Sequence, residues 1–228
     1  MFEQRFDRND TFDTWRLVIA GTSLTVSLIY LAFAGRPSSP LRTALKTASI
    51  GTLALLPWTY LGTTGANPLF ILSLALALSA LGDFFLALKD QQRFFLYGLG
   101  TFLAAHVAYL AAFLPHATVP QGSALIAVVA TLAAASAFLA VLVPRLGKMK
   151  LPVIAYFTII MAMAAAAWSI PNASWMLGAG AVIFAISDSL IAQRKFLKPF
   201  PGHHAAVWMT YIAAQFMMTA AFLHFIVP

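Results

Sequence analysis

The sequence predicts an all-α membrane protein built as a bundle of eight transmembrane helices. Three observations predict this fold class. First, 61% of the 228 residues are hydrophobic and only 9% are charged, whereas a soluble domain carries about 25% charged residues. Second, apolar runs of about 20 residues, the length that crosses a bilayer, recur along the chain. Third, turn-forming or basic segments separate these runs.

The first four predicted spans end at turn residues or basic residues. The span at 15–34 follows a short polar tail over 1–14 and ends at GRPSSP. The span at 43–62 ends at TTGANP, and the span at 68–88 ends at a basic loop. The span at 94–115 ends at LPHATVPQG, which is rich in turn residues.

The second four spans follow the same pattern. The span at 121–143 ends at PRLGKMK, and the span at 151–170 ends at SIPNAS. The span at 174–192 ends at a basic loop, and the last span covers 203–226. These runs are too long for barrel strands, so we expect helices. We expect them to form a single transmembrane domain over 1–228.

Lysine and arginine gather in alternate loops. The loops after the second, fourth and sixth spans hold none. Because basic loops face the cytoplasm, this pattern predicts cytoplasmic odd-numbered loops and both termini on the outer side of the inner membrane. The basic residues of the odd-numbered loops are Arg36, Arg42, Lys89, Arg93, Arg145, Lys148, Lys150, Arg194, Lys195 and Lys198.

Charge and cysteine content exclude several function classes. The net charge is +7, but the basic residues lie in small groups and form no continuous basic face, so nucleic acid is not an expected partner. The absence of cysteine excludes disulfides, thiolate metal sites and cysteine nucleophiles. Membrane lipids are the expected surroundings, and no obligate protein partner is evident.

Asp83 and Asp188 are the candidate catalytic residues, because each lies inside an apolar span about six residues before a basic loop. An ionisable group in a membrane costs a few kcal/mol or more and is usually kept for function. Their matched depth, roughly 6–8 Å from the cytoplasmic end at 1.5 Å per residue, predicts one shared site in the cytoplasmic half.

Other polar side chains are expected near that level of the bundle, and we take them as candidate substrate-binding residues. Each also has a simpler interpretation, such as snorkelling for the lysine, packing for the tyrosines, a hydrogen-bonded bundle histidine, or a structural ion pair for either aspartate. The sequence lacks the paired histidine or carboxylate spacing of a metal site, so neither a metal nor a cofactor is expected. The candidates are Lys46, His106, Tyr109, Tyr156, Tyr211 and Gln215.

A weak internal repeat relates the two halves of the chain. The third and fourth spans resemble the seventh and eighth, with Asp83 matching Asp188 and His106 matching Gln215 when four residues are inserted in the later loop. Trp58 likewise corresponds to the tryptophan that ends the sixth span. The sequence therefore favours a four-plus-four arrangement.

Several of these segments together resemble a known family. LGDFFLAL, AAHVAYLAAF, GAVIFAISDSLIAQRKF and MTYIAAQFMM, in this order after a span that bears Lys46, resemble the YhhN/TMEM86 family of lysoplasmalogenases. The match departs in one place, where Lys46 precedes threonine instead of proline. The resemblance implies an eight-helix enzyme that cleaves the vinyl ether of lysoplasmalogens, lysophospholipid substrates, and it implies catalysis by Asp83 and Asp188. The basic rim formed by Arg42, Lys89, Arg93, Arg194 and Lys195 would attract the headgroup.

Two other function classes stay open on the sequence. Intramembrane carboxylates in a repeated fold also suit a proton- or cation-coupled transporter of a small metabolite or lipid. A lipid-binding protein without catalytic activity would use the aspartates for structure only. A transporter would move substrate without product, whereas an enzyme would release aldehyde in the absence of any gradient.

Overall fold

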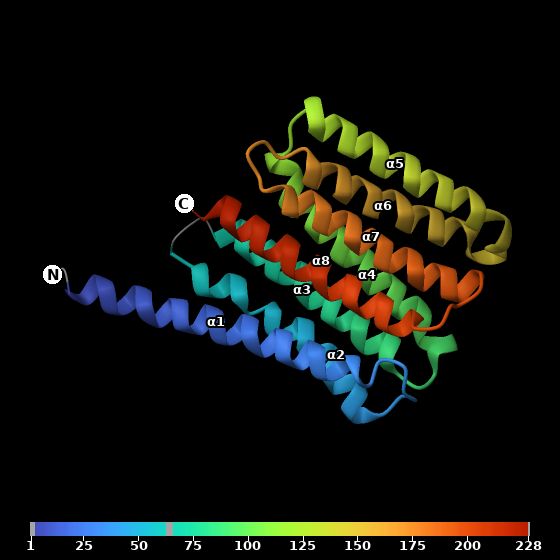
Figure 1. Cartoon of the computed structure of the whole chain (residues 1–228), viewed down its shortest axis with the longest axis horizontal. Coiled ribbons are helices and arrows are strands. Elements are labelled where there is room, and N and C mark those ends of the chain that lie inside the picture. Colours follow the sequence, from blue (N-terminus) through green and yellow to red (C-terminus); the bar gives the residue numbers. More distant parts are fainter. Residues whose placement is uncertain (1–2, 63–65, 228) are drawn as a thin grey trace. The chain divides into compact units, whose positions relative to one another are not determined.

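The computed structural model describes residues 3–62 and 66–227, and the regular secondary structure of this part of the chain is helical. Eight α-helices follow one another along the chain (Figure 1). The all-α fold predicted from the sequence is therefore confirmed. The helices are α1 Glu3–Leu31, α2 Pro40–Leu53, α3 Ala66–Ala87, α4 Gln91–Phe113, α5 Gly122–Leu142, α6 Lys150–Trp168, α7 Trp175–Phe196 and α8 His203–Ile226.

Seven of the described helices are long and apolar enough to cross a membrane, and α2 is the exception. This composition confirms a multi-pass membrane protein. The apolar part of α1 covers Phe12–Leu31, but the helix itself begins at Glu3. The predicted polar tail over 1–14 is thus helical from that residue onward.

The second predicted span, 43–62, is not one continuous α-helix. Helix α2 ends at Leu53, and a 3₁₀ helix, η1, covers Leu56–Tyr60. Pro57 has no backbone N–H to donate to the carbonyl of Leu53, so the α-helical ladder stops there. The side chain of Ser73 in α3 donates to the carbonyl of Ala54 at 2.7 Å, and the indole of Trp58 donates to Ser73 at 2.8 Å.

The described helices divide into two compact units, one that ends at Ala105 and one over 106–226. The prediction of a single domain over 1–228 stays a prediction. In the first unit, α2 packs against both α1 and α3. The first part of α4 approaches α3 closely at Gly82, where an added Cβ would lie 2.6 Å from the ring of Phe102. Glycine at this position therefore permits the close approach of α4 next to Asp83.

In the second unit, α6 packs against α5 and α7, and α7 packs along α8 (Figure 1). Gly178 lets α7 approach the end of α6, because a Cβ there would lie 2.2 Å from the ring of Trp168. Gly180 permits a similar close approach to α8, because a Cβ there would lie 2.9 Å from the side chain of Met218. These small residues bring the polar side chains of α6, α7 and α8 within reach of one another.

Candidate active site

A carboxylate, a phenol and an imidazole meet inside the second unit. The hydroxyl of Tyr156 in α6 donates a 2.5 Å hydrogen bond to Oδ2 of Asp188 in α7. Nε2 of His106, from α4, lies 3.5 Å from the same oxygen. Asp188 is 8% exposed and His106 is fully buried. The structure thus brings three groups capable of acid–base chemistry together away from bulk water.

Local sequence explains how Asp188 is held. The hydroxyl of Ser187 donates to the backbone carbonyl of Val207 at 3.0 Å, which ties α7 to α8 one residue before the carboxylate. On the α6 side, the Tyr156 ring packs nearly perpendicular to the His106 imidazole at a centroid distance of 5.3 Å. The carboxylate thus has one neighbour from α4 and one from α6, and its own helix is tied to α8 next to it.

A second polar pair lies in the same unit. The hydroxyl of Tyr109 in α4 donates to Oε1 of Gln215 in α8 at 2.5 Å, and both side chains are fully buried. Among the described residues, Nε2 of Gln215 and the hydroxyl of Thr219 have no hydrogen-bond partner. Thr219 follows Gln215 by one helical turn, so both groups lie on one face of α8. These groups can donate hydrogen bonds to a bound water or ligand.

Phe184 is the residue of this cluster that the sequence analysis did not single out. Its fully buried ring lies 4.7 Å from the ring of His106, 6.3 Å from Tyr109 and 5.4 Å from Tyr211. It precedes Asp188 by four residues, so helical periodicity places both on one face of α7, and that spacing was the available signal. Its apolar ring lowers the local polarity, which strengthens the remaining polar contacts.

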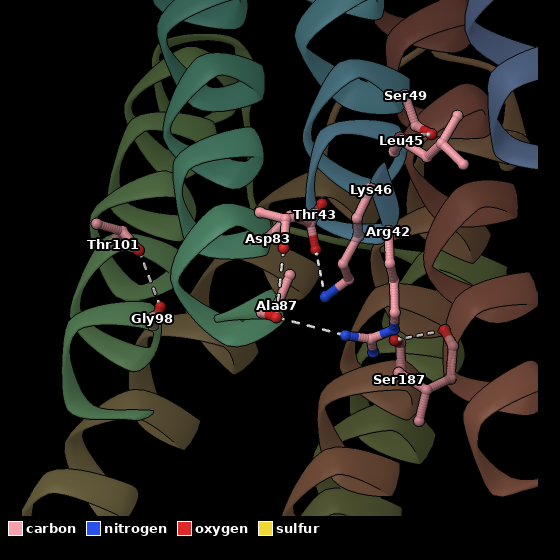
Figure 2. A network of polar contacts seen from close by, with 11 residues as sticks. Arg42, Thr43, Leu45, Lys46, Ser49, Asp83, Ala87, Gly98, Thr101 and Ser187 are labelled. Carbon is pink, nitrogen blue, oxygen red and sulfur yellow. Dashed lines mark hydrogen bonds and ion pairs between the residues drawn. The ribbon is translucent and has the colours of Figure 1, made fainter. Parts of the chain in front are cut away.

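The other candidate carboxylate belongs to the first unit. Nζ of Lys46 in α2 lies 2.9 Å from Oδ1 of Asp83 in α3, and the Asp83 side chain is 2% exposed (Figure 2). A structural ion pair is the simpler interpretation that the sequence left open for Asp83. A carboxylate paired in this way can also take part in catalysis. Asp188 belongs to the second unit, so the prediction that the two carboxylates share one site stays a prediction.

These site residues lie in a segment of the chain that matches a known protein family. The model of the YhhN family matches residues 41–222. This chain belongs to the YhhN family. The match includes all eight predicted site residues, from Lys46 to Gln215.

Proteins named lysoplasmalogenase are among the relatives of this YhhN protein. One from Mycobacterium bovis is 36% identical over 152 residues, which are 65% of this chain and 58% of that protein. Human "Lysoplasmalogenase TMEM86B" is 34% identical over 68% of this chain and 64% of its own length. The chain thus covers less than two thirds of these relatives. No solved structure matches it.

The two units of this YhhN protein contain matching contacts. Lys46 and Tyr156 lie on the second helix of each half, and each contacts the aspartate of the following helix, Asp83 or Asp188. Trp58 follows Lys46 by the same number of residues as Trp168, at the end of α6, follows Tyr156. The four-plus-four repeat stays a prediction, which these matched contacts favour.

Proposed function

We propose that this YhhN family member hydrolyses the vinyl ether bond of lysoplasmalogens. The products would be a fatty aldehyde and glycerophosphoethanolamine or glycerophosphocholine. The observation that carries the proposal is the buried contact of Asp188 with Tyr156 and His106 in a chain whose relatives are named lysoplasmalogenases. A substrate with one long apolar chain also suits a protein whose helices cross a membrane.

The chemistry of a vinyl ether requires a proton donor. The double-bond carbon farther from the ether oxygen takes a proton, which leaves a cation shared by the nearer carbon and that oxygen. Water then adds to the nearer carbon and loses a proton. The resulting hemiacetal breaks its bond to the glycerol oxygen, which leaves with a proton as the alcohol. Glycosidases stabilise a related oxocarbenium ion with two carboxyl groups.

Asp188 is the proposed proton donor. The phenol of Tyr156 holds one carboxyl oxygen at 2.5 Å, which fixes the orientation of the acid. Next to that oxygen, His106 is proposed to return a proton to Asp188 after each turnover. Positioned acid–base groups of this kind contribute about 10²- to 10⁴-fold to rates.

Asp83 is the second proposed catalytic carboxylate. Its Oδ1 lies 2.9 Å from the ammonium nitrogen of Lys46, which supplies a charge of opposite sign. An ionised carboxylate can stabilise the cationic intermediate or take a proton from the attacking water. Gln215, Tyr109 and Tyr211 are proposed to orient substrate and water, with the amide nitrogen of Gln215 as a hydrogen-bond donor.

The test is a product assay with purified protein in detergent and synthetic 1-alkenyl lysophosphatidylethanolamine. Fatty aldehyde is measured by mass spectrometry for the wild type, Asp188→Asn and Asp83→Asn. Asp90→Asn is the matched control, because Asp90 is exposed and caps the backbone N–H of Arg93, a contact that asparagine keeps. We expect aldehyde from the wild type and from Asp90→Asn, and a loss of at least about 10²-fold in the other two variants.

Two outcomes contradict the proposal. If the wild type releases no aldehyde but moves the intact lipid across a vesicle membrane, the protein is a transporter. If Asp188→Asn melts at the wild-type temperature and still releases aldehyde at the wild-type rate, Asp188 is not the acid. Measuring the melting temperature of each variant separates lost catalysis from lost folding.

A further inference from the structure

Arg42 differs from the other basic residues expected at the cytoplasmic rim. It lies in the first turn of α2 and is only 6% exposed. Lys89, Arg93, Arg194 and Lys195 are all exposed. An exposed cation is solvated and needs no partner, whereas a buried cation is strongly unfavourable unless it is paired. Arg42 therefore differs in burial from the other four cations of that basic rim.

The contacts of Arg42 include no full negative charge. Its guanidinium carbon lies 5.8 Å from the centre of the buried Tyr30 ring, a cation–π contact. Nη1 donates to the backbone carbonyl of Ala87, the last residue of α3, at 3.4 Å (Figure 2). The same carbonyl already accepts from the hydroxyls of Ser38 at 2.6 Å and Thr43 at 3.4 Å. This carbonyl ends α3, whose C-terminal partial negative charge favours a nearby cation. It carries no full charge, so it offsets the guanidinium only in part. Nε of Arg42 has no hydrogen-bond partner among the described residues.

The neighbouring charges do not supply the missing anion. Lys46 follows Arg42 by one turn of α2, on the same face of the helix, and it is paired with Asp83. Among the described residues, the ion pairs involve Asp13, Asp83 and Asp188, and none of them includes Arg42. The partial positive charge at the N-terminus of α2 adds to the same field.

The architecture of the helix pair does not itself require this cation. When Lys46 is matched to Tyr156, the position of Arg42 corresponds to Pro152 in α6. Helices α6 and α7 nevertheless pack together in the second unit, as α2 and α3 do in the first. Arg42 thus has no matching cation in α6, and a bound anionic ligand would explain why a cation is buried in α2.

We propose that Arg42 binds the phosphodiester of the lysophospholipid headgroup. The planar guanidinium carries several donors in a fork that matches phosphate oxygens, and it keeps its charge at any physiological pH. The inference rests on the proposed function for the identity of the lipid. It extends that function by naming the group that recognises the headgroup and by predicting that a lipid without phosphate binds poorly.

The test measures binding by isothermal titration calorimetry on the full chain in detergent. The ligands are a saturated 1-O-alkyl lysophosphatidylethanolamine, a 1-O-alkylglycerol of the same chain length, and inorganic phosphate. The saturated ether cannot undergo vinyl ether hydrolysis, so this test does not depend on the catalytic proposal. The variants are Arg42→Gln and Arg42→Lys. Arg36→Gln is the matched control, because Arg36 belongs to the same loop region but is exposed.

We expect the wild type and Arg36→Gln to bind the phosphate-bearing lipid about tenfold or more tightly than the alkylglycerol, as the loss of a charged hydrogen bond predicts. In Arg42→Gln this preference disappears, and in Arg42→Lys part of it remains. Equal wild-type affinity for the two lipids overturns the inference, as does an unchanged preference in Arg42→Gln. If Arg42→Gln does not fold, the inference is tested by the wild-type preference and by its reduction in Arg42→Lys.

Inorganic phosphate distinguishes the source of the anion. We expect it to compete only weakly with the lysolipid, because the alkyl chain contributes most of the apolar burial. If inorganic phosphate binds as tightly as the lysolipid, the site takes free phosphate and the headgroup assignment is wrong. If the phosphate preference is found but vinyl ether hydrolysis is not, the inference stands and the proposed function fails.

Discussion

The hydroxyl of Tyr156 donates a 2.5 Å hydrogen bond to the carboxyl group of Asp188, and both side chains are buried. A phenol in this position restricts the rotation of the carboxyl group that we propose as the proton donor. Nε2 of His106 lies 3.5 Å from the same oxygen, so Asp188 has two chemically different neighbours. Single substitutions can therefore assign a role to each.

Removing the Tyr156 hydroxyl should reduce activity more than stability. Tyr156→Phe keeps the ring and its edge contact with His106 but loses the hydrogen bond to Asp188. We expect kcat to fall about tenfold to a hundredfold, and the free energy of unfolding to fall by about 1 kcal/mol. Tyr97→Phe is the control, because Tyr97 is exposed. Equal kcat values in the two variants would mean that the phenol does not orient the acid.

Replacing His106 tests the return of the proton. His106→Gln keeps a hydrogen-bonding group of similar reach but cannot exchange a proton at neutral pH. We expect aldehyde release to fall by about 10²-fold while the lysolipid binds as it does in the wild type. His224→Gln, at an exposed position near the end of α8, should leave the rate unchanged. A rate near the wild-type value in His106→Gln would show that Asp188 is reprotonated by another route.

Part of this structure could be predicted from the sequence because hydropathy and turn residues set the helices. The span at 43–62 was expected as one helix, and Pro57 is the residue that explains why α2 ends at Leu53. Lys46 and Asp83 were expected at one level of the bundle, and they are in contact. Burial of Arg42 could not be predicted, because it depends on tertiary packing and its loop position alone suggests an exposed cation.

The packing of α4 against α3 should depend on Gly82. An alanine there would place its Cβ 2.6 Å from the ring of Phe102, which is itself 4% exposed and has little room to move. We expect Gly82→Ala to lower the free energy of unfolding by about 1–3 kcal/mol. It should also reduce activity, because Asp83 is the next residue.

Gly100→Ala is the matched control for this substitution. Gly100 lies on α4, the helix that packs against Gly82, but an added Cβ there would meet nothing within 4 Å. Alanine is the better helix former, so we expect an unchanged or slightly higher melting temperature. If both glycine variants melt at the same temperature as the wild type, α4 does not need its close approach to α3.

The ion pair between Lys46 and Asp83 should have a large coupling energy. Lys46→Met leaves a carboxylate that is 2% exposed without its ammonium neighbour, and we expect a loss of about 3 kcal/mol in the free energy of unfolding. In Lys46→Met with Asp83→Asn, neither charge remains, so the double variant should lose less than the sum of the single losses, by about 1–3 kcal/mol. Denaturant titration of the purified protein in detergent gives the four values.

The exposed pair of Asp13 and Arg16 provides the control cycle. Their side chains are 2.6 Å apart, but that of Asp13 is 61% exposed, so solvent screens the interaction. We expect Asp13→Asn and Arg16→Met to couple by about 0.5 kcal/mol or less. If the Lys46 and Asp83 cycle gives a value equally small, their contact does not stabilise the fold.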